Sequence, residues 1–78
     1  MTRTKTPIVL DVRDLEPPEP MVRTMEALDT LTASEKLLVL LPREPYPLYR
    51  ALQLKGFTWK SERQADGTVE VLIQHQKS

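Results

Sequence analysis

Two short stretches of the sequence place charged side chains between closely spaced prolines. Residues 10–20 and residues 42–47 each contain three prolines. Guanidinium groups bind carboxylates and other anions, and a tyrosine ring with a polar tip suits an interface. Among the charged and tyrosyl side chains of these stretches, the candidate binding residues are Asp11, Arg13, Glu19, Arg43, Glu44 and Tyr46.

The composition excludes most catalytic and metal-binding chemistry. The chain has no cysteine, which rules out disulfides, thiolate metal sites, cysteine nucleophiles and persulfides. One histidine, His75, cannot form a histidine metal cluster, and we expect it to be solvated. The carboxylates of Asp14 and Glu16 have no apolar segment beside them that would suit acid–base work. We therefore expect no enzyme, no catalytic residue, no metal and no cofactor.

The charge balance argues against nucleic acid as a partner, and the short apolar runs argue against a membrane. Eleven basic and eleven acidic side chains give a formal net charge of zero, and the nearest basic cluster is Arg3 with Lys5. The longest apolar run, residues 37–41, is far shorter than the roughly 20 residues that span a bilayer. No signal-peptide stretch is recognisable at the N-terminus, so we expect a cytoplasmic protein.

The chain length predicts one small domain, residues 1–78, with an ordered core over about residues 7–75. Residues 8–12 are rich in β-branched side chains and predict a strand. A helix is expected to start at Pro20, with Thr24 facing solvent and one apolar face. We expect that inward face to contain Met21, Val22, Met25, Leu28 and Leu31.

The second half of the chain predicts one more helix and three more strands. Residues 37–41 are apolar on both sides, which is typical of an interior strand. A helix over about residues 47–55 is expected to end at Gly56 in a left-handed cap. Two alternating strands then flank the Asp66-Gly67 turn.

This order, β-α-β-α-β-β, predicts an α+β two-layer sandwich. Its four-stranded mixed sheet would carry both helices on one face, because right-handed crossovers join parallel strands. Both proline-rich connections would then leave the carboxyl ends of their strands at one edge, where open α/β sheets usually bind ligands.

The stretch Leu10–Pro20 resembles the Leu-Asp-x-Arg-Gly-Leu-x-Cys-Pro-x-Pro signature of the TusA/SirA-like sulfur-carrier proteins. These are small β-α-β-α-β-β sandwiches of about this length, so the resemblance covers nearly the whole chain. The positions that match are Asp11, Arg13, Leu15, Pro18 and Pro20.

Two departures from that signature change what the resemblance implies. Asp14 replaces a glycine, and Pro17 replaces the sulfur-carrying cysteine, so sulfur transfer by this chain is ruled out. The chain looks closer to a cysteine-less, uncharacterised branch whose second loop reads His-Asp/Glu-Pro-x-Pro-Leu. Residues 44–48 match that pattern, and Arg43 stands where histidine is common. The resemblance implies a setting in redox or in sulfur or nitrogen metabolism.

Two functions remain open from the sequence. The first is a non-enzymatic protein-interaction or regulatory module that uses the proline-rich loops or the uncovered sheet face; poorly covered Val9 and Leu72 would favour a homodimer. The alternative is a small-molecule or anion site at the shared edge, built from Arg13, Arg43 and two helix N-termini. Asp11 with Arg13, and Arg43 with Glu44, are also interpretable as plain structural ion pairs.

Overall fold

The structure of this chain is a computed structural model that describes residues 6–76. Arg3 and Lys5, the basic pair near the N-terminus, lie outside these residues. The elements are β1 (Ile8–Asp11), α1 (Glu19–Asp29), β2 (Lys36–Leu41), α2 (Tyr46–Lys55), β3 (Phe57–Arg63) and β4 (Val69–His75). The predicted order of strands and helices is confirmed.

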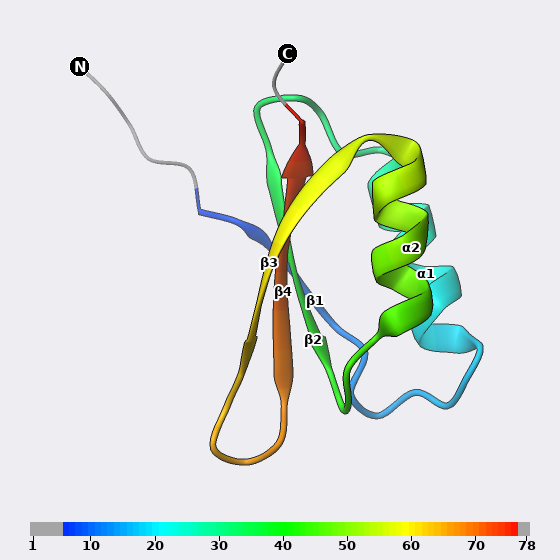
Figure 1. Cartoon of the computed structure of the whole chain (residues 1–78), viewed down its shortest axis with the longest axis vertical. Helices are drawn as coiled ribbons and strands as arrows, with labels where there is room; N and C mark the ends of the chain where they lie inside the picture. The colour runs from blue at the N-terminus through cyan, green and yellow to red at the C-terminus, as the bar shows by residue number, and fades with distance from the viewer. Residues whose placement is uncertain (1–5, 77–78) are drawn as a thin grey trace.

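The four strands form one mixed sheet in the order β1-β2-β4-β3. β1 pairs parallel with β2, while β4 pairs antiparallel with both β2 and β3. Both helices lie on one face of this sheet, as Figure 1 shows, so the predicted two-layer sandwich is confirmed. β2 is an interior strand, as predicted. Leu37, Val39 and Leu41 are buried toward the helices, whereas Leu38 and Leu40 are half-buried on the opposite face.

The core fills the space between the helices and the sheet. Alternate residues of β2, β4 and β3 face the helices, because successive side chains of a strand point to opposite faces. The buried apolar side chains are Val12, Leu28, Leu31, Leu37, Val39, Leu41, Leu48, Leu52, Phe57, Val69, Val71 and Ile73.

The predicted inward face of α1 is wrong at two positions. Thr24, expected to face solvent, is fully buried, and Val22, expected to be inside, is 45% exposed. The inward positions follow the spacing i, i+3, i+4 and i+7 from Met21, which includes Thr24 and leaves Val22 outside. The Thr24 hydroxyl donates a hydrogen bond to the carbonyl oxygen of Pro20 at 2.8 Å, so burial does not leave it unsatisfied.

His75 is also not the solvated side chain that we expected. It is half-buried, its ring centroid lies 4.5 Å from that of Phe57, and its Nε2 lies 2.8 Å from the carbonyl oxygen of Leu31. β4 continues through His75, and this extension carries the ring to the chain segment that follows α1.

The two helices begin one residue earlier than predicted, at Glu19 and at Tyr46. The predicted C-terminal cap of α2 is confirmed, because Gly56 has the left-handed φ of 84°. The predicted hairpin turn is confirmed as well: Gly67 has φ 92°, and the Thr68 amide donates to Asp66 Oδ1 at 2.9 Å.

Replacing Gly56 with alanine is expected to lower the free energy of unfolding by about 1 kcal/mol, because a side chain disfavours a positive φ. No atom lies within 4 Å of the Cβ that alanine would add, so the cost is conformational rather than a clash. Urea denaturation measures it, with Gln53→Ala, on the exposed part of α2, as the control. Equal unfolding midpoints for the two variants would contradict a stabilising role of Gly56 as the C-terminal cap of α2.

Candidate functional site

The two proline-rich loops lie side by side at the carboxyl ends of β1 and β2 (Figure 1). One loop joins β1 to α1 and the other joins β2 to α2. A cavity of about 450 Å³ opens between them, at the edge where the sequence placed the candidate site. Its floor is formed by the first turns of the two helices and the end of β2.

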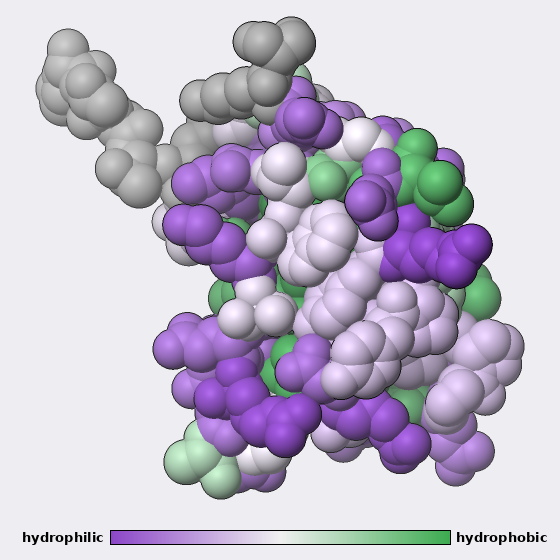
Figure 2. All heavy atoms as spheres, in the orientation of Figure 1, coloured by the Kyte–Doolittle hydropathy of each residue, from purple (hydrophilic) through white to green (hydrophobic). Residues whose placement is uncertain are grey.

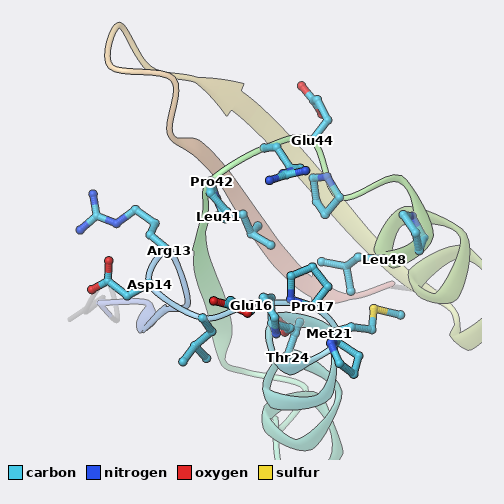
Figure 3. Close-up of a pocket in the computed structure, with 16 residues that line it drawn as sticks. Arg13, Asp14, Glu16, Pro17, Met21, Thr24, Leu41, Pro42, Glu44 and Leu48 are labelled. Carbon is cyan, nitrogen blue, oxygen red and sulfur yellow. The ribbon is translucent and has the colours of Figure 1, made fainter.

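The walls of this cavity consist largely of proline rings. Every proline of the chain except Pro7 lines it: Pro17, Pro18, Pro20, Pro42, Pro45 and Pro47. Figure 3 shows Met21, Thr24 and Leu48 grouped with Pro17 on the inner side of the loops. Because proline fixes φ and lacks an N–H donor, these walls are stiff and offer few backbone amide donors.

The same prolines leave few amide groups for an anion at the helix N-termini. Pro18 and Pro45 occupy the N-cap positions, and neither helix has a side-chain cap. Pro20 and Pro47, in the first turns, have no N–H. The Glu19 amide donates to the Glu16 carbonyl oxygen at 2.9 Å, and the Leu48 amide donates to the Pro45 carbonyl oxygen at 2.9 Å. The usual anion-binding capacity of a helix N-terminus is therefore reduced here.

Asp11 and Arg13 form a two-pronged ion pair beside the cavity. Arg13 Nε donates to Asp11 Oδ1 at 2.9 Å, and Nη2 donates to Oδ2 at 2.8 Å. These hydrogen bonds from the Arg13 side chain are the main reason why the pKa of Asp11 falls to about 2. In Figure 3 the guanidinium group of Arg13 extends away from the cavity, which Arg13 lines only in part.

Removing this ion pair is expected to change the pH dependence of the protein. In Arg13→Gln the pKa of Asp11 should rise toward its ordinary 3.8. Because the folded protein holds this pKa low, the pair favours folding at neutral pH, and its contribution fades as pH falls from 3.8 to about 2. Carbon-13 NMR of the Asp11 carboxyl group measures the titration, with Arg23→Gln as the control. If Asp11 of the unmodified protein titrated with its ordinary pKa of 3.8, this would contradict the ion pair between Asp11 and Arg13.

Glu44 is held by contacts from α2 and β3. The Tyr49 hydroxyl donates to Glu44 Oε1 at 2.7 Å, and Arg63 Nη2 lies 3.5 Å from Glu44 Oε2. Burial is the largest cause of the raised pKa of Tyr49, which keeps its hydroxyl protonated as a donor. The second proline-rich loop is therefore tied to the edge strand β3.

Three aromatic rings continue from this contact along the surface. Tyr49 stacks on Trp59 with ring centroids 5.5 Å apart, and Tyr46 meets Tyr49 edge-on at 6.1 Å. Tyr46 is 70% exposed. Figure 2 shows pale, weakly polar side chains gathered over α2 and β3, with charged groups around them.

The structure brings together only part of the residue set that the sequence singled out. Arg13, Arg43 and Glu44 line the cavity. Asp11, Glu19 and Tyr46 do not belong to its lining. Of those three, Asp11 pairs with Arg13, and Glu19 pairs with Arg23 across one turn of α1 at 3.4 Å. Tyr46 lies on the aromatic surface.

The sequence reasoning missed the apolar and hydroxyl floor of the cavity. Thr24 and Leu48 line it from α1 and α2, and Leu41 lines it from the end of β2. The helical spacing from Met21 to Leu28 carried the signal for Thr24, but its polar side chain suggested an outward position. Leu48 was correctly expected inside, without a role at the site.

The comparison with known protein families gives one match. The family described as "Uncharacterized conserved protein (DUF2249)" matches residues 9–75. The chain belongs to this family. The DUF2249 match includes both proline-rich loops and the whole cavity lining, so the site lies within the part of the chain that the family shares. No curated protein matches the chain, and no solved structure matches it.

DUF2249 membership agrees with the predicted assignment to an uncharacterised family. Within residues 6–76, no three histidine, aspartate or glutamate side chains are placed to share a metal ion. The two helices of this described part have 11 and 10 residues, and neither has the length and apolar character needed to cross a bilayer.

Proposed function

We propose that this chain is a non-enzymatic protein-interaction module whose docking site is the proline-lined cavity. The observation that carries this proposal is the stiff, apolar lining between the two loops. Ligand cavities range over roughly 300–1,000 Å³, so a cavity of about 450 Å³ accepts one or two apolar side chains. A preformed cavity also lowers the entropy cost of binding, because its walls need no ordering.

The charges around the cavity favour a partner segment with a basic residue beside its apolar anchor. Asp14, Glu16 and Glu44 contribute three carboxylates to the lining, against the guanidinium groups of Arg13 and Arg43. Asp11 already neutralises Arg13, and Arg63 pairs with Glu44, which leaves Asp14 and Glu16 against Arg43. The remaining excess is negative, so a lysine or arginine next to the anchor would be attracted to the rim.

The second candidate is a small-molecule or anion site, which Arg13 and Arg43 in the lining favour. It has less support, because the prolines remove amide donors and three carboxylates would repel an anion. Thermal unfolding with phosphate, sulfate and a panel of small carboxylates tests it. A rise in Tm that disappears in the Arg13→Ala, Arg43→Ala variant would support the anion site, and no rise with any compound would reject it.

The resemblance to the TusA/SirA-like sulfur carriers adds a proposal about descent. The shared order of elements and the matching stretch at Leu10–Pro20 support a common origin. Pro17, in place of the carrier's cysteine, lines the cavity. On this proposal the module keeps the carrier's fold without its sulfur chemistry, and its partner belongs to cytoplasmic redox, sulfur or nitrogen metabolism.

Selection from a displayed library of short random peptides tests the interaction module. We expect the unmodified protein to select peptides with a large apolar residue next to a lysine or arginine. Met21→Trp adds bulk to the cavity lining and should abolish their binding. Val22→Trp adds the same side chain at the neighbouring exposed position, outside the lining, and should leave binding unchanged. Peptides that bind both variants equally well would contradict the proposed site.

A further inference from the structure

Within residues 6–76, no helix or loop covers the face of the sheet opposite the helices. Strand register arranges its side chains in three rows that run across the strands. We name them by their character. The basic row is Lys36, Gln74 and Thr58; the apolar row is Val9, Leu38 and Leu72 and ends in Lys60; the acidic row is Asp11, Leu40, Glu70 and Glu62.

The acidic row contains a contact between two like charges, and no ion pair among residues 6–76 neutralises either of them. Glu62 and Glu70 lie directly opposite each other on β3 and β4. Like charges at such paired positions destabilise a sheet.

The other end of the same face shows the complementary feature. A hollow of about 130 Å³ lies between Lys36 and Lys60, over Gln74 and Leu72. Both lysines are exposed, and no ion pair within the described residues includes them. A small hollow between two ammonium groups fits a carboxylate side chain.

We propose that a second copy of this chain packs face to face on this surface, about a twofold axis that runs across the strands through the apolar row. Such an axis reverses the order of the rows, so the basic row of each copy meets the acidic row of the other. Glu70 of one copy then lies opposite Gln74 of its partner, above the hollow between the two lysines. Leu38 and Leu72 meet their own counterparts, as a self-complementary interface requires. Lys60, at the end of the same row, also meets its counterpart, and Glu62 of each copy lies in the neighbouring row on the same strand.

The charges distinguish this axis from the other simple arrangement. A twofold axis along the strands would place every row against the same row of the other copy, so the two acidic rows would meet, with Asp11 of one copy against Glu62 of the other. An unrelated partner with one dominant charge would match one row and oppose the other. A second copy is the occupant that satisfies both rows at once.

The size of the face sets the expected strength of this dimer. Four strands about 4.8 Å apart, with about six residues each at 3.3 Å, give roughly 20 by 20 Å, or about 400 Å² per copy. Interfaces of this size are small, so we expect a transient dimer with a Kd in the micromolar range. The cavity lies among the loops and helices, away from this face, so the dimer presents two open cavities.

Charge reversal combined with sedimentation velocity tests the proposal. The Lys36→Glu, Lys60→Glu variant replaces both lysines of the face by acidic residues. The Glu62→Lys, Glu70→Lys variant leaves Asp11, which is paired with Arg13, as the one acidic side chain in the three rows. Each variant alone should be monomeric at concentrations where the unmodified chain dimerises, and an equimolar mixture of the two should dimerise again. This rescue also separates a lost interface from a damaged fold.

A matched control reverses two charges in the helix layer. Arg50→Glu with Lys55→Glu makes the same change in net charge on exposed residues of α2 and should leave the dimer intact. Leu72→Asp should abolish dimerisation while circular dichroism remains that of the folded chain. Three results would each overturn the proposal: an unmodified chain that stays monomeric up to about 1 mM, a dimer that survives both face reversals, or no dimer in the mixture.

Discussion

Replacing Leu52 with alanine is expected to remove about 3 kcal/mol from the free energy of unfolding. The Leu52 side chain is completely buried, where α2 packs on the sheet. Removing it leaves a cavity that the surrounding strands can only partly fill, since both neighbouring layers are regular structure. A domain of 78 residues has a total stability of only several kcal/mol, so this substitution brings the chain close to unfolding.

Urea denaturation monitored by circular dichroism measures this effect, with Leu54→Ala as the control. Leu54 lies two residues further along α2 and is 79% exposed, so its loss should change stability by less than about 0.5 kcal/mol. Similar unfolding midpoints for the two variants would contradict the packing of α2 on its buried face.

Replacing Trp59 with alanine is expected to cost about 2–3 kcal/mol, because a half-buried aromatic ring and its stacking partner are lost together. The Trp59 ring lies parallel to Tyr49 within 8°, and the Tyr49 hydroxyl holds Glu44 in the second proline-rich loop. The substitution should therefore weaken peptide binding at the cavity as well as stability. Trp59→Phe keeps a stacking ring and should cost about half as much.

A double-mutant cycle isolates the stacking energy from simple loss of area. Tyr49→Ala, Trp59→Ala and the double variant should give a coupling free energy of about 1 kcal/mol in chemical denaturation. A coupling near zero would mean that Trp59 stabilises the sheet alone, and that the second loop is not tied to β3 through these rings.

The fold could be predicted from the sequence because its signals are local. The Asp66-Gly67 turn, the left-handed Gly56 and the unbroken apolar run at residues 37–41 each determine one element almost independently of the rest of the chain. The helices were harder at their ends, since Glu19 and Tyr46 enter the helix before the prolines that suggested its start.

The errors arise where a polar side chain has a tertiary role. Thr24 is buried because it lies on the face of α1 that packs against the sheet, and its hydrogen bond to the Pro20 carbonyl oxygen satisfies the hydroxyl there. His75 is half-buried because the end of β4 carries it to Leu31, a residue 44 positions away in the sequence. Contacts of this kind depend on the strand order, and the sequence left that order open.

The candidate site was predicted in position but not in character. The two crossovers predicted that the site lies at the carboxyl ends of β1 and β2. The predicted binding residues, however, were charged and tyrosyl side chains and did not include the prolines. In the structure Arg13 and Glu44 are occupied by Asp11 and Tyr49, and the prolines enclose the cavity. A cavity wall assembled from two separate loops has no periodicity for a sequence to reveal.

An NMR titration of the nitrogen-15-labelled chain shows whether the proline-lined cavity binds an apolar group. N-acetyl-leucinamide and inorganic phosphate serve as the two probes. We expect saturable shifts of the lining amides of Leu15, Thr24 and Leu41 with N-acetyl-leucinamide, retained in Val22→Trp and lost in Met21→Trp. Saturable shifts at Arg13 and Arg43 with phosphate, together with none from N-acetyl-leucinamide, would contradict binding of an apolar group in this cavity.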